Sequence, residues 1–168
     1  MLEGEFCEMI FVTLGSQKFQ FNRLLKKIDE LVEEKIITEP IFAQIGYSDY
    51  KPLHYEYKEF LDRDEFSAQM DRAQLVITHG GTGAIIGAVK KEKKVIAVPR
   101  LAKYGEHVDD HQRQIVKQFE ELNLICPCND IDQLDISLKT AQYTTYQKYH
   151  SNTKRIIENI EKFIEECV

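Results

Sequence analysis

Short apolar runs alternate with amphipathic stretches along most of the chain. The runs "MIFVTLG" (9–15) and "PIFAQIG" (40–46) are apolar, partly β-branched and end in glycine, as expected for strands that are buried on both faces. Between residues 21 and 36 the apolar positions recur at steps of three and four, which predicts a helix with one apolar face formed by Leu24, Leu25, Ile28, Leu31 and Val32.

The same alternation continues to the C-terminus. Residues 53–57 alternate aromatic and polar side chains, which predicts a less buried strand, and the acidic start of residues 62–73 predicts a short helix. The next elements are predicted as a strand at 75–79, a turn at 80–83, a helix at 84–91 and a strand at 94–98. A polar loop, a helix from His107 or Asp109, a short strand at 123–128 and a helix capped by residues 130–134 follow. The last predicted element is a long helix from Thr144 to Val168, whose apolar face consists of Ile156, Ile157, Ile160, Phe163 and Ile164.

Strands that alternate with helices indicate a mainly parallel sheet covered on both sides. We therefore predict one doubly wound, Rossmann-like α/β domain over residues 9–168, and 168 residues suffice for its core. Residues 1–8 precede a second methionine, Met9, and are interpreted as an expression remnant or an alternative start.

Composition narrows the class of protein. Twenty-two basic and 28 acidic side chains give a net charge of −6, which excludes nonspecific nucleic-acid binding as the main task. The four cysteines, at positions 7, 126, 128 and 167, fit neither a disulfide framework nor a zinc half-site, and they favour a reducing, cytoplasmic setting. No apolar run approaches the roughly 18 residues that span a bilayer, so we expect neither export nor a membrane span.

The glycine-rich turn "THGGTG" is the strongest candidate for a ligand site. Gly80, Gly81 and Gly83 let the backbone approach a ligand, and the helix that follows directs unpaired N–H groups towards an anion such as a diphosphate. Thr82 adds a hydroxyl donor, and His79 can donate to a phosphate oxygen. Without a ligand, the same residues would form a tight turn capped by Thr82, with His79 as a structural hydrogen-bonding residue.

Two further groups of residues extend this site. Gly15, in "TLGSQ" after the first strand, could donate a backbone N–H at the same rim. The segment "GEHVDDHQ" supplies Glu106, Asp110, His111 and Gln112, whose carboxylates and amide suit sugar hydroxyls, or else a solvated helix start. His107 and His111 would share a helical face and could bind a metal, but no third ligand is fixed by spacing, so we predict no metal and no cofactor.

Gly81, Gly83 and Gly87 also match a loose dinucleotide pattern, with Arg100 placed for a 2′-phosphate. This pattern would make the protein an NADP-dependent reductase. The usual fingerprint, however, belongs to the first strand of its domain, whereas three β-rich segments precede this turn.

The motifs "VTLG", "ITHGGTGAI" and "KVIAVPRLAKYGEHVDDHQ" together resemble a known family over residues 9–124. The family is the small cytoplasmic subunit of two-component glycosyltransferases in bacterial exopolysaccharide and capsule synthesis. It is similar to the C-terminal half of the lipid II-forming N-acetylglucosaminyltransferase and to the soluble subunit of the dolichol-linked UDP-GlcNAc transferase.

The resemblance implies the donor-binding half of a GT-B enzyme, in a heteromeric complex with a membrane-anchored, acceptor-binding subunit. By position it places Gly15 and the turn from His79 to Gly83 against the diphosphate of a UDP-sugar, and Glu106, Asp110, His111 and Gln112 against the sugar or ribose. Related proteins often carry an acid that reaches the ribose where this chain has Gly87, so the chain departs from the family pattern at this position.

The implied activity is the transfer of a hexose to a lipid-diphosphate-linked saccharide, at the inner face of the plasma membrane through the partner. No catalytic residue is assigned, because the general base is expected on the partner. The alternative is that the chain is a noncatalytic subunit that activates its partner.

The length of the chain also indicates a partner subunit, because a donor site without a second domain cannot close over the reacting centre. The C-terminal helix is then either a docking element or a cover for its own sheet.

Overall fold

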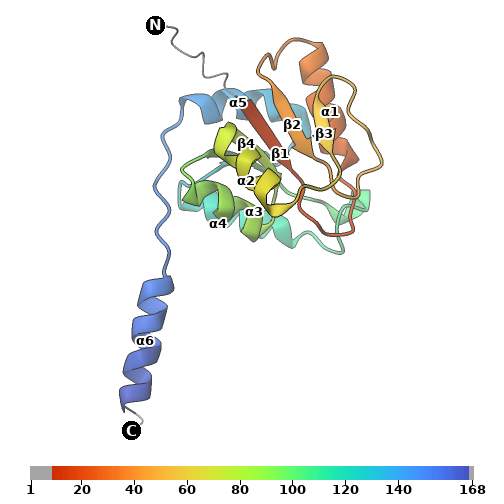
Figure 1. Ribbon diagram of the computed structural model, residues 1–168. Coiled ribbons are helices and arrows are strands. Elements are labelled where there is room, and N and C mark those ends of the chain that lie inside the picture. The colour runs from red at the N-terminus through yellow and green to blue at the C-terminus, as the bar shows by residue number, and fades with distance from the viewer. Residues whose placement is uncertain (1–8, 167–168) are drawn as a thin grey trace, which may run out of the picture.

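The computed structural model describes residues 9–166, apart from the side chains of residues 155–156, 159 and 163–166. Six parallel strands form one sheet in the order β3-β2-β1-β4-β5-β6 (Figure 1). They are β1 (Met9–Thr13), β2 (Ile41–Gln44), β3 (Glu56–Lys58), β4 (Ala73–His79), β5 (Lys94–Val98) and β6 (Cys126–Pro127). This arrangement confirms the predicted doubly wound α/β fold.

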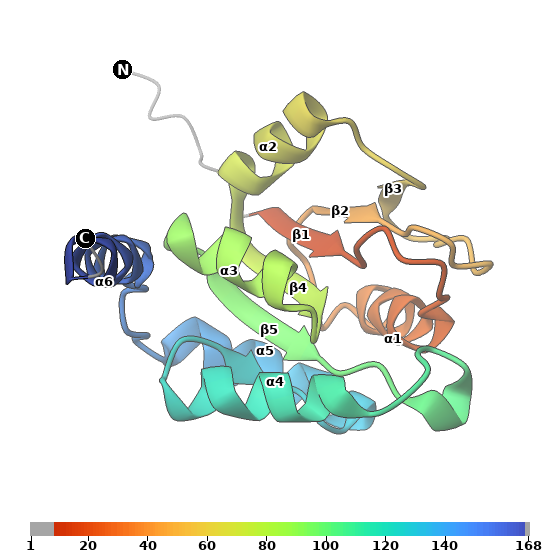
Figure 2. The ribbon, with the colours of Figure 1, turned by 90° about the horizontal axis from the view of Figure 1, so that it is seen from below.

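Helices cover both faces of the sheet and create two apolar clusters. On one face, α1 (Asn22–Glu33) and α5 (Leu134–Tyr143) pack on the side chains of Ile10, Val12 and Ile77. On the other, α2 (Arg63–Arg72), α3 (Thr82–Lys90) and α4 (His111–Glu121) pack on Phe11 and Val76 (Figure 2). The central strands are buried on both faces, which explains why they read as continuous apolar runs.

The strand register brings three loops to one edge of the sheet. Thr13 at the end of β1 pairs with Thr78, and His79 at the end of β4 pairs with Val98 at the end of β5. The segments that follow β1, β4 and β5 therefore leave the sheet at the same level. In doubly wound sheets this carboxyl rim is where ligands bind.

Two of the predicted helices begin later than expected. The helix α4 begins at His111 rather than at His107 or Asp109, because the short helix η1 (Ala102–Tyr104) and the left-handed Gly105 turn the chain before it. The C-terminal helix α6 (Thr153–Glu166) begins nine residues after Thr144. Tyr146 and Tyr149 pack against the two core clusters instead, so this connecting segment stays non-helical.

The helix α6 projects away from the sheet domain (Figures 1 and 2). The side chains of Ile157 and Ile160 are 49% and 54% exposed. The remaining apolar residues of the predicted face, Ile156, Phe163 and Ile164, lie outside the described side chains. Within residues 9–166, no helix has both the length and the apolarity that crossing a membrane requires.

Candidate functional site

The β4–α3 turn is the centre of the candidate site. Gly81 is the N-cap of α3, which begins at the exposed Thr82, and no side chain caps this helix start. The helix begins two residues earlier than predicted, so Thr82 and Gly83 both lie in its first turn. The N–H groups of a first turn have no intrahelical partner, and together they form a positively polarised site for an anion.

Close packing requires glycine at three positions of the site. A Cβ on Gly81 would lie 2.3 Å from His79 Nε2, and a Cβ on Gly80 would lie 2.8 Å from Gln112 Cβ. Gly15, with φ +72°, would place a Cβ 2.8 Å from His79 Cε1. The structure therefore brings the loop after β1 and the β4–α3 turn into close contact with the same imidazole.

His79 is a largely buried imidazole in this site. Burial lowers the pKa of His79 to about 4, and the nearby Arg100 guanidinium adds to the effect. Its Nδ1 lies 3.3 Å from the Thr78 hydroxyl, which itself donates to Thr13 O over 2.8 Å. The ring is therefore neutral at pH 7 and held in one orientation beside the glycines.

Gln112 joins two of the loops from inside the protein. Its side chain is 3% exposed, and Oε1 accepts hydrogen bonds from Gly80 N at 3.1 Å and from Arg100 N at 3.0 Å. This single oxygen fixes the β4–α3 turn relative to the loop after β5. Gln112 was predicted to contact the donor, and its oxygen instead has this internal role.

The Arg100 side chain lies inside the protein, below the loops at the carboxyl edge of the sheet, and not at the surface. It is 2% exposed, and its guanidinium donates to Leu14 O at 2.6 Å, Phe19 O at 2.9 Å and Glu106 O at 3.3 Å. Burial lowers the pKa of Arg100 to about 10, opposed by the charge of Glu106, and the group stays cationic at neutral pH. The expectation that it could receive a 2′-phosphate is wrong, because these carbonyls and its burial keep it away from ligands.

Glu106 is also turned inward. It is fully buried, and both carboxylate oxygens pair with Arg23, at 2.9 Å to Nε and 3.0 Å to NH2. Leu101 N donates to Oε2 at 2.9 Å. Because these bonds occupy the carboxylate, Glu106 supports the loop rather than facing a sugar.

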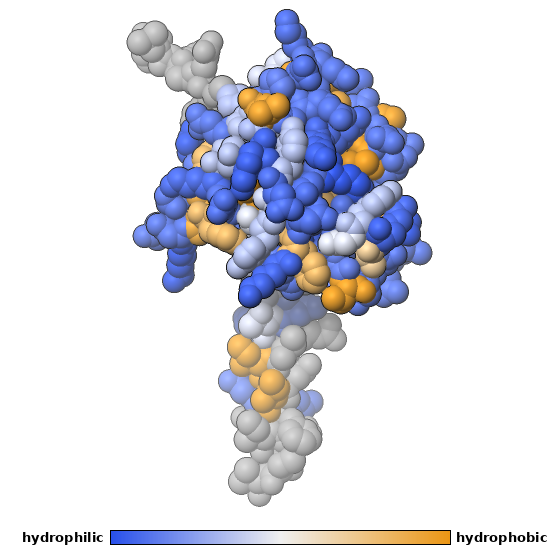
Figure 3. Space-filling model, turned by 90° about the vertical axis from the view of Figure 1, so that its right-hand side faces the viewer, coloured by the Kyte–Doolittle hydropathy of each residue, from blue (hydrophilic) through white to orange (hydrophobic). Residues whose placement is uncertain are grey.

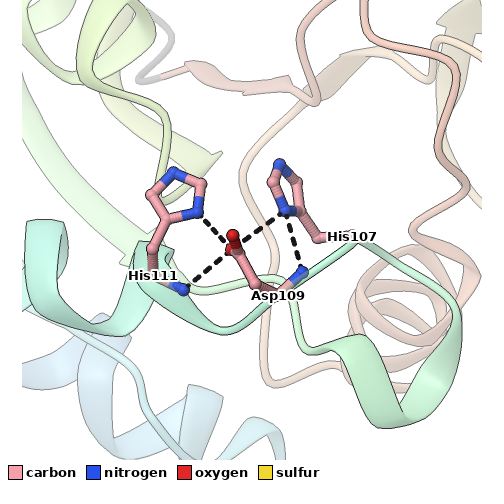
Figure 4. A group of neighbouring side chains, drawn as sticks. All are labelled: His107, Asp109 and His111. Atoms are coloured by element: carbon pink, nitrogen blue, oxygen red, sulfur yellow. Dashed lines mark hydrogen bonds and ion pairs between the residues drawn. The ribbon is translucent and has the colours of Figure 1, made fainter.

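The remaining predicted residues lie at the surface. Asp110 is exposed, and its carboxylate accepts a hydrogen bond from Ala102 N at 2.8 Å. His111 is the first residue of α4, and its ring contacts the carboxylate of Asp109 (Figure 4). The predicted site residues thus divide into an outward set of Gly15, Gly81, Thr82, Gly83, Asp110 and His111, and an inward set of Gly80, Glu106 and Gln112, with the largely buried His79 between the two sets.

Sequence reasoning missed Arg23 and Phe19 as parts of the site. Arg23 lies on α1, 83 residues before Glu106, and no local sequence pattern predicts that the two side chains pair. Phe19 lies 5.1 Å from His107 between ring centroids. The usable signal for Arg23 is Glu106 itself, because an acid that is buried in a loop requires a cationic partner.

The six-stranded parallel sheet with helices on both faces is the Rossmann-like fold that forms the C-terminal half of GT-B glycosyltransferases. The chain belongs to the glycosyltransferase family 28 C-terminal domain family, which matches residues 9–167. This family assignment establishes the chain as a glycosyltransferase domain.

Two matches to ALG13 proteins accompany the family assignment. A 75-residue segment is 36% identical to the UDP-N-acetylglucosamine transferase subunit ALG13 of Eremothecium gossypii, covering 41% of this chain and 35% of that protein. The chain thus spans about a third of the length of this relative. An NMR structure of ALG13 superimposes with a TM-score of 0.61 at 19% identity, covering 91% of this chain and 94% of that one.

Longer glycosyltransferases contain the same fold as one part. MurG of Acinetobacter baumannii matches with a TM-score of 0.56 at 16% identity over 93% of this chain and 50% of its own. The glycosyltransferase of kitacinnamycin matches with a TM-score of 0.62 at 16% identity over 82% of this chain and 35% of its own. At these identities the likeness concerns the fold.

Proposed function

We propose that this chain is the donor-binding catalytic subunit of a glycosyltransferase that moves a hexose from a UDP-sugar to a lipid-diphosphate-linked acceptor. The observation that carries the proposal is the uncapped first turn of α3, with Gly15 and His79 beside it, at the carboxyl rim of a family 28 domain. The uridine nucleotide is further supported by the name of the fungal relative, a UDP-N-acetylglucosamine transferase subunit.

The proposed chemistry is the departure of UDP from the anomeric carbon. As the glycosidic bond breaks, negative charge grows on the diphosphate, and the fixed N–H groups of Thr82 and Gly83 stabilise it without reorganisation. The Thr82 hydroxyl adds a donor, while Asp110 and His111 face the sugar or ribose. Glu106 and Gln112 become positioning residues in this scheme. The general base that deprotonates the acceptor belongs to the partner.

A partner subunit is part of the proposal, and α6 is its docking element. Figure 3 shows hydrophobic residues gathered on the visible face of this helix, and the described ones, Ile157 and Ile160, are about half exposed. An apolar stripe exposed to water is stabilised when another surface covers it. We propose that this surface belongs to a membrane-anchored, acceptor-binding subunit, which places the enzyme at the inner face of the plasma membrane.

The biological setting that we propose is exopolysaccharide or capsule synthesis. The proposal rests on the motifs between residues 9 and 124, which resemble those of the two-component enzymes of that synthesis. The test is coexpression with a membrane-anchored partner, which we expect to be encoded beside this chain, followed by a screen of UDP-sugars on lipid-linked acceptors. We expect transfer only when both chains are present. Absence of UDP and UDP-sugar binding by calorimetry, with the partner present, contradicts the proposal.

Replacing Gly83 by alanine is expected to weaken UDP binding about tenfold or more, which is about 1.4 kcal/mol. Nothing lies within 4 Å of a Cβ at this position, so the substitution leaves the fold intact, while the added methyl obstructs an anion at the helix start. Calorimetric titration with UDP measures the change.

Gly87→Ala is the matched control. Gly87 lies one turn later in α3, is exposed, and also has nothing within 4 Å of an added Cβ. Here UDP affinity should stay unchanged while the free energy of unfolding rises by about 0.5–1 kcal/mol, because alanine favours a helix interior. Equal UDP affinities for the two variants would place the anion away from the first turn of α3.

A noncatalytic activating subunit predicts a different outcome in the reconstituted pair. Thr82→Ala and His111→Ala would then leave the transfer rate unchanged, whereas a donor-binding subunit loses activity with either substitution. The NADP-dependent alternative loses its phosphate-binding residue, because Arg100 is held by three backbone carbonyls inside the domain.

A further inference from the structure

Three side chains with metal-binding atoms converge beside the candidate donor site. One ring nitrogen of His107, one of His111 and one carboxylate oxygen of Asp109 all lie within 4.8 Å of one another. Figure 4 shows the two imidazoles on either side of the carboxylate, each with a ring nitrogen directed towards it. The ring centroids of the histidines are 4.9 Å apart.

The fold, rather than a helical repeat, brings these ligands together. His107 precedes α4, and Asp109 lies in the bend between the histidines, so the third ligand that spacing alone did not supply comes from this bend. The backbone N of His111 donates to Asp109 Oδ1 at 3.1 Å, which holds the carboxylate between the rings.

The loop around the cluster is held from inside the protein. The neighbouring Glu106 is fully buried against Arg23, and its backbone carbonyl accepts a hydrogen bond from Arg100. The ring of Phe19 packs on that of His107, whose side chain is only 9% exposed. A cluster supported in this way loses little freedom when it binds an ion.

We propose that His107, Asp109 and His111 form a binding site for one divalent transition-metal ion of the zinc class. Tetrahedral zinc with bonds of about 2.0–2.2 Å places its ligand atoms about 3.3–3.5 Å apart. The distance from His107 Nδ1 to Asp109 Oδ1 is 3.3 Å. The contact between Asp109 and His111 is shorter, and the ion opens it by taking the position between the two atoms.

The donor set selects the kind of ion. Two imidazole nitrogens and one carboxylate oxygen suit Zn²⁺, Co²⁺ or Ni²⁺, whereas Mg²⁺ and Ca²⁺ prefer a set made of oxygens. Three protein ligands leave a fourth position for water or for an oxygen of a bound ligand. The site shares His111 with the proposed donor site, so its test uses His107 and Asp109, to which the proposed sugar transfer assigns no role.

A second histidine–aspartate pair in the same chain shows the contrast. His54 Nδ1 lies 3.1 Å from Asp29 Oδ1, but Asp29 is buried and also accepts hydrogen bonds from Tyr50 OH, Leu53 N and His54 N. That carboxylate is saturated, and the pair forms no group of three ligands among the described residues. His54→Gln is therefore the matched control for a histidine substitution.

The test is metal binding by the untagged chain at pH 7.5, without nucleotide. Calorimetric titration with Zn²⁺ should give one equivalent, and Co²⁺ should give visible absorption bands of a site with nitrogen and oxygen ligands. His107→Gln and Asp109→Asn should each weaken Zn²⁺ binding by at least about 100-fold, more than outer-shell substitutions usually cause. His54→Gln should bind as the wild type does, and circular dichroism should show all variants folded.

Three results of the Zn²⁺ titrations would overturn the proposal. They are absence of stoichiometric Zn²⁺ binding, binding that survives in His107→Gln, and displacement of Zn²⁺ by millimolar Mg²⁺. A thiolate-to-cobalt charge-transfer band would also contradict it, since it would place the ion on cysteine. Because no readout depends on sugar transfer, failure of the metal site leaves the proposed function untouched, and the reverse holds as well.

Discussion

Replacing Glu106 by glutamine is expected to lower the free energy of unfolding by about 3 kcal/mol, the low end of the cost of removing one partner of a buried ion pair, because the Arg23 side chain is 19% exposed. Glu106 is fully buried, and its carboxylate binds Arg23 through two hydrogen bonds and Leu101 N through a third. Glutamine keeps the shape but leaves the Arg23 guanidinium without its counter-charge. Urea denaturation of the two proteins measures the difference.

The ligand site should respond to the same substitution. Glu106 holds the loop that carries Asp110 and His111, and its backbone carbonyl accepts from Arg100, which also binds the loop after β1. We therefore expect UDP affinity to fall together with stability.

Glu121→Gln provides the control, because the pair that Glu121 forms with Lys117 is exposed and 3.9 Å apart. Its removal should cost less than about 1 kcal/mol. A similar small cost for Glu106→Gln would show that the Arg23 pair does not support the loop. A double-mutant cycle with Arg23→Gln then isolates the coupling between the two side chains.

The fold was predictable because burial on both faces leaves a strong signal in the sequence. β1, β4 and β5 pair in the middle of the sheet, and their apolar runs have no polar face to confuse the pattern. The edge strand β3 is exposed throughout and only three residues long, so the alternation of aromatic and polar residues predicted its boundaries only approximately. The apolar periodicity predicted the existence of helix α6 but not its first residue. The helix begins late because Tyr146 and Tyr149 pack on the domain, and this tertiary contact leaves no mark in the local sequence.

The candidate site was predictable only in part, because a residue type does not reveal which way its side chain turns. The glycines followed from the physics of anion binding at a helix start. Glu106 and Gln112 belong to the same short segment as Asp110 and His111, yet the first two turn inward and the last two lie at the surface. Their partners, Arg23 and the backbone of Gly80, come from elements distant in the chain.

Lowering the pH from 7 to 4 is expected to destabilise the protein, with His79 contributing up to about 3 kcal/mol. Burial lowers the pKa of His79 from 6.5 to about 4, so between these values the unfolded chain binds a proton that the folded chain does not. The contribution of His79 is therefore fully present above pH 6.5 and is lost as the pH falls towards 4. Urea denaturation at several pH values measures the slope.

His79→Gln separates this contribution from that of other titrating groups, because their effects cancel when the variant is compared with the wild type. The variant should show a smaller loss of stability between pH 6.5 and 4, and equal losses would contradict a neutral, buried His79. A bound diphosphate should act in the opposite direction, since a nearby anion raises the pKa of an imidazole. With saturating UDP, the NMR titration of the His79 ring should therefore shift to higher pH, and this shift would place the anion beside His79 and the first turn of α3.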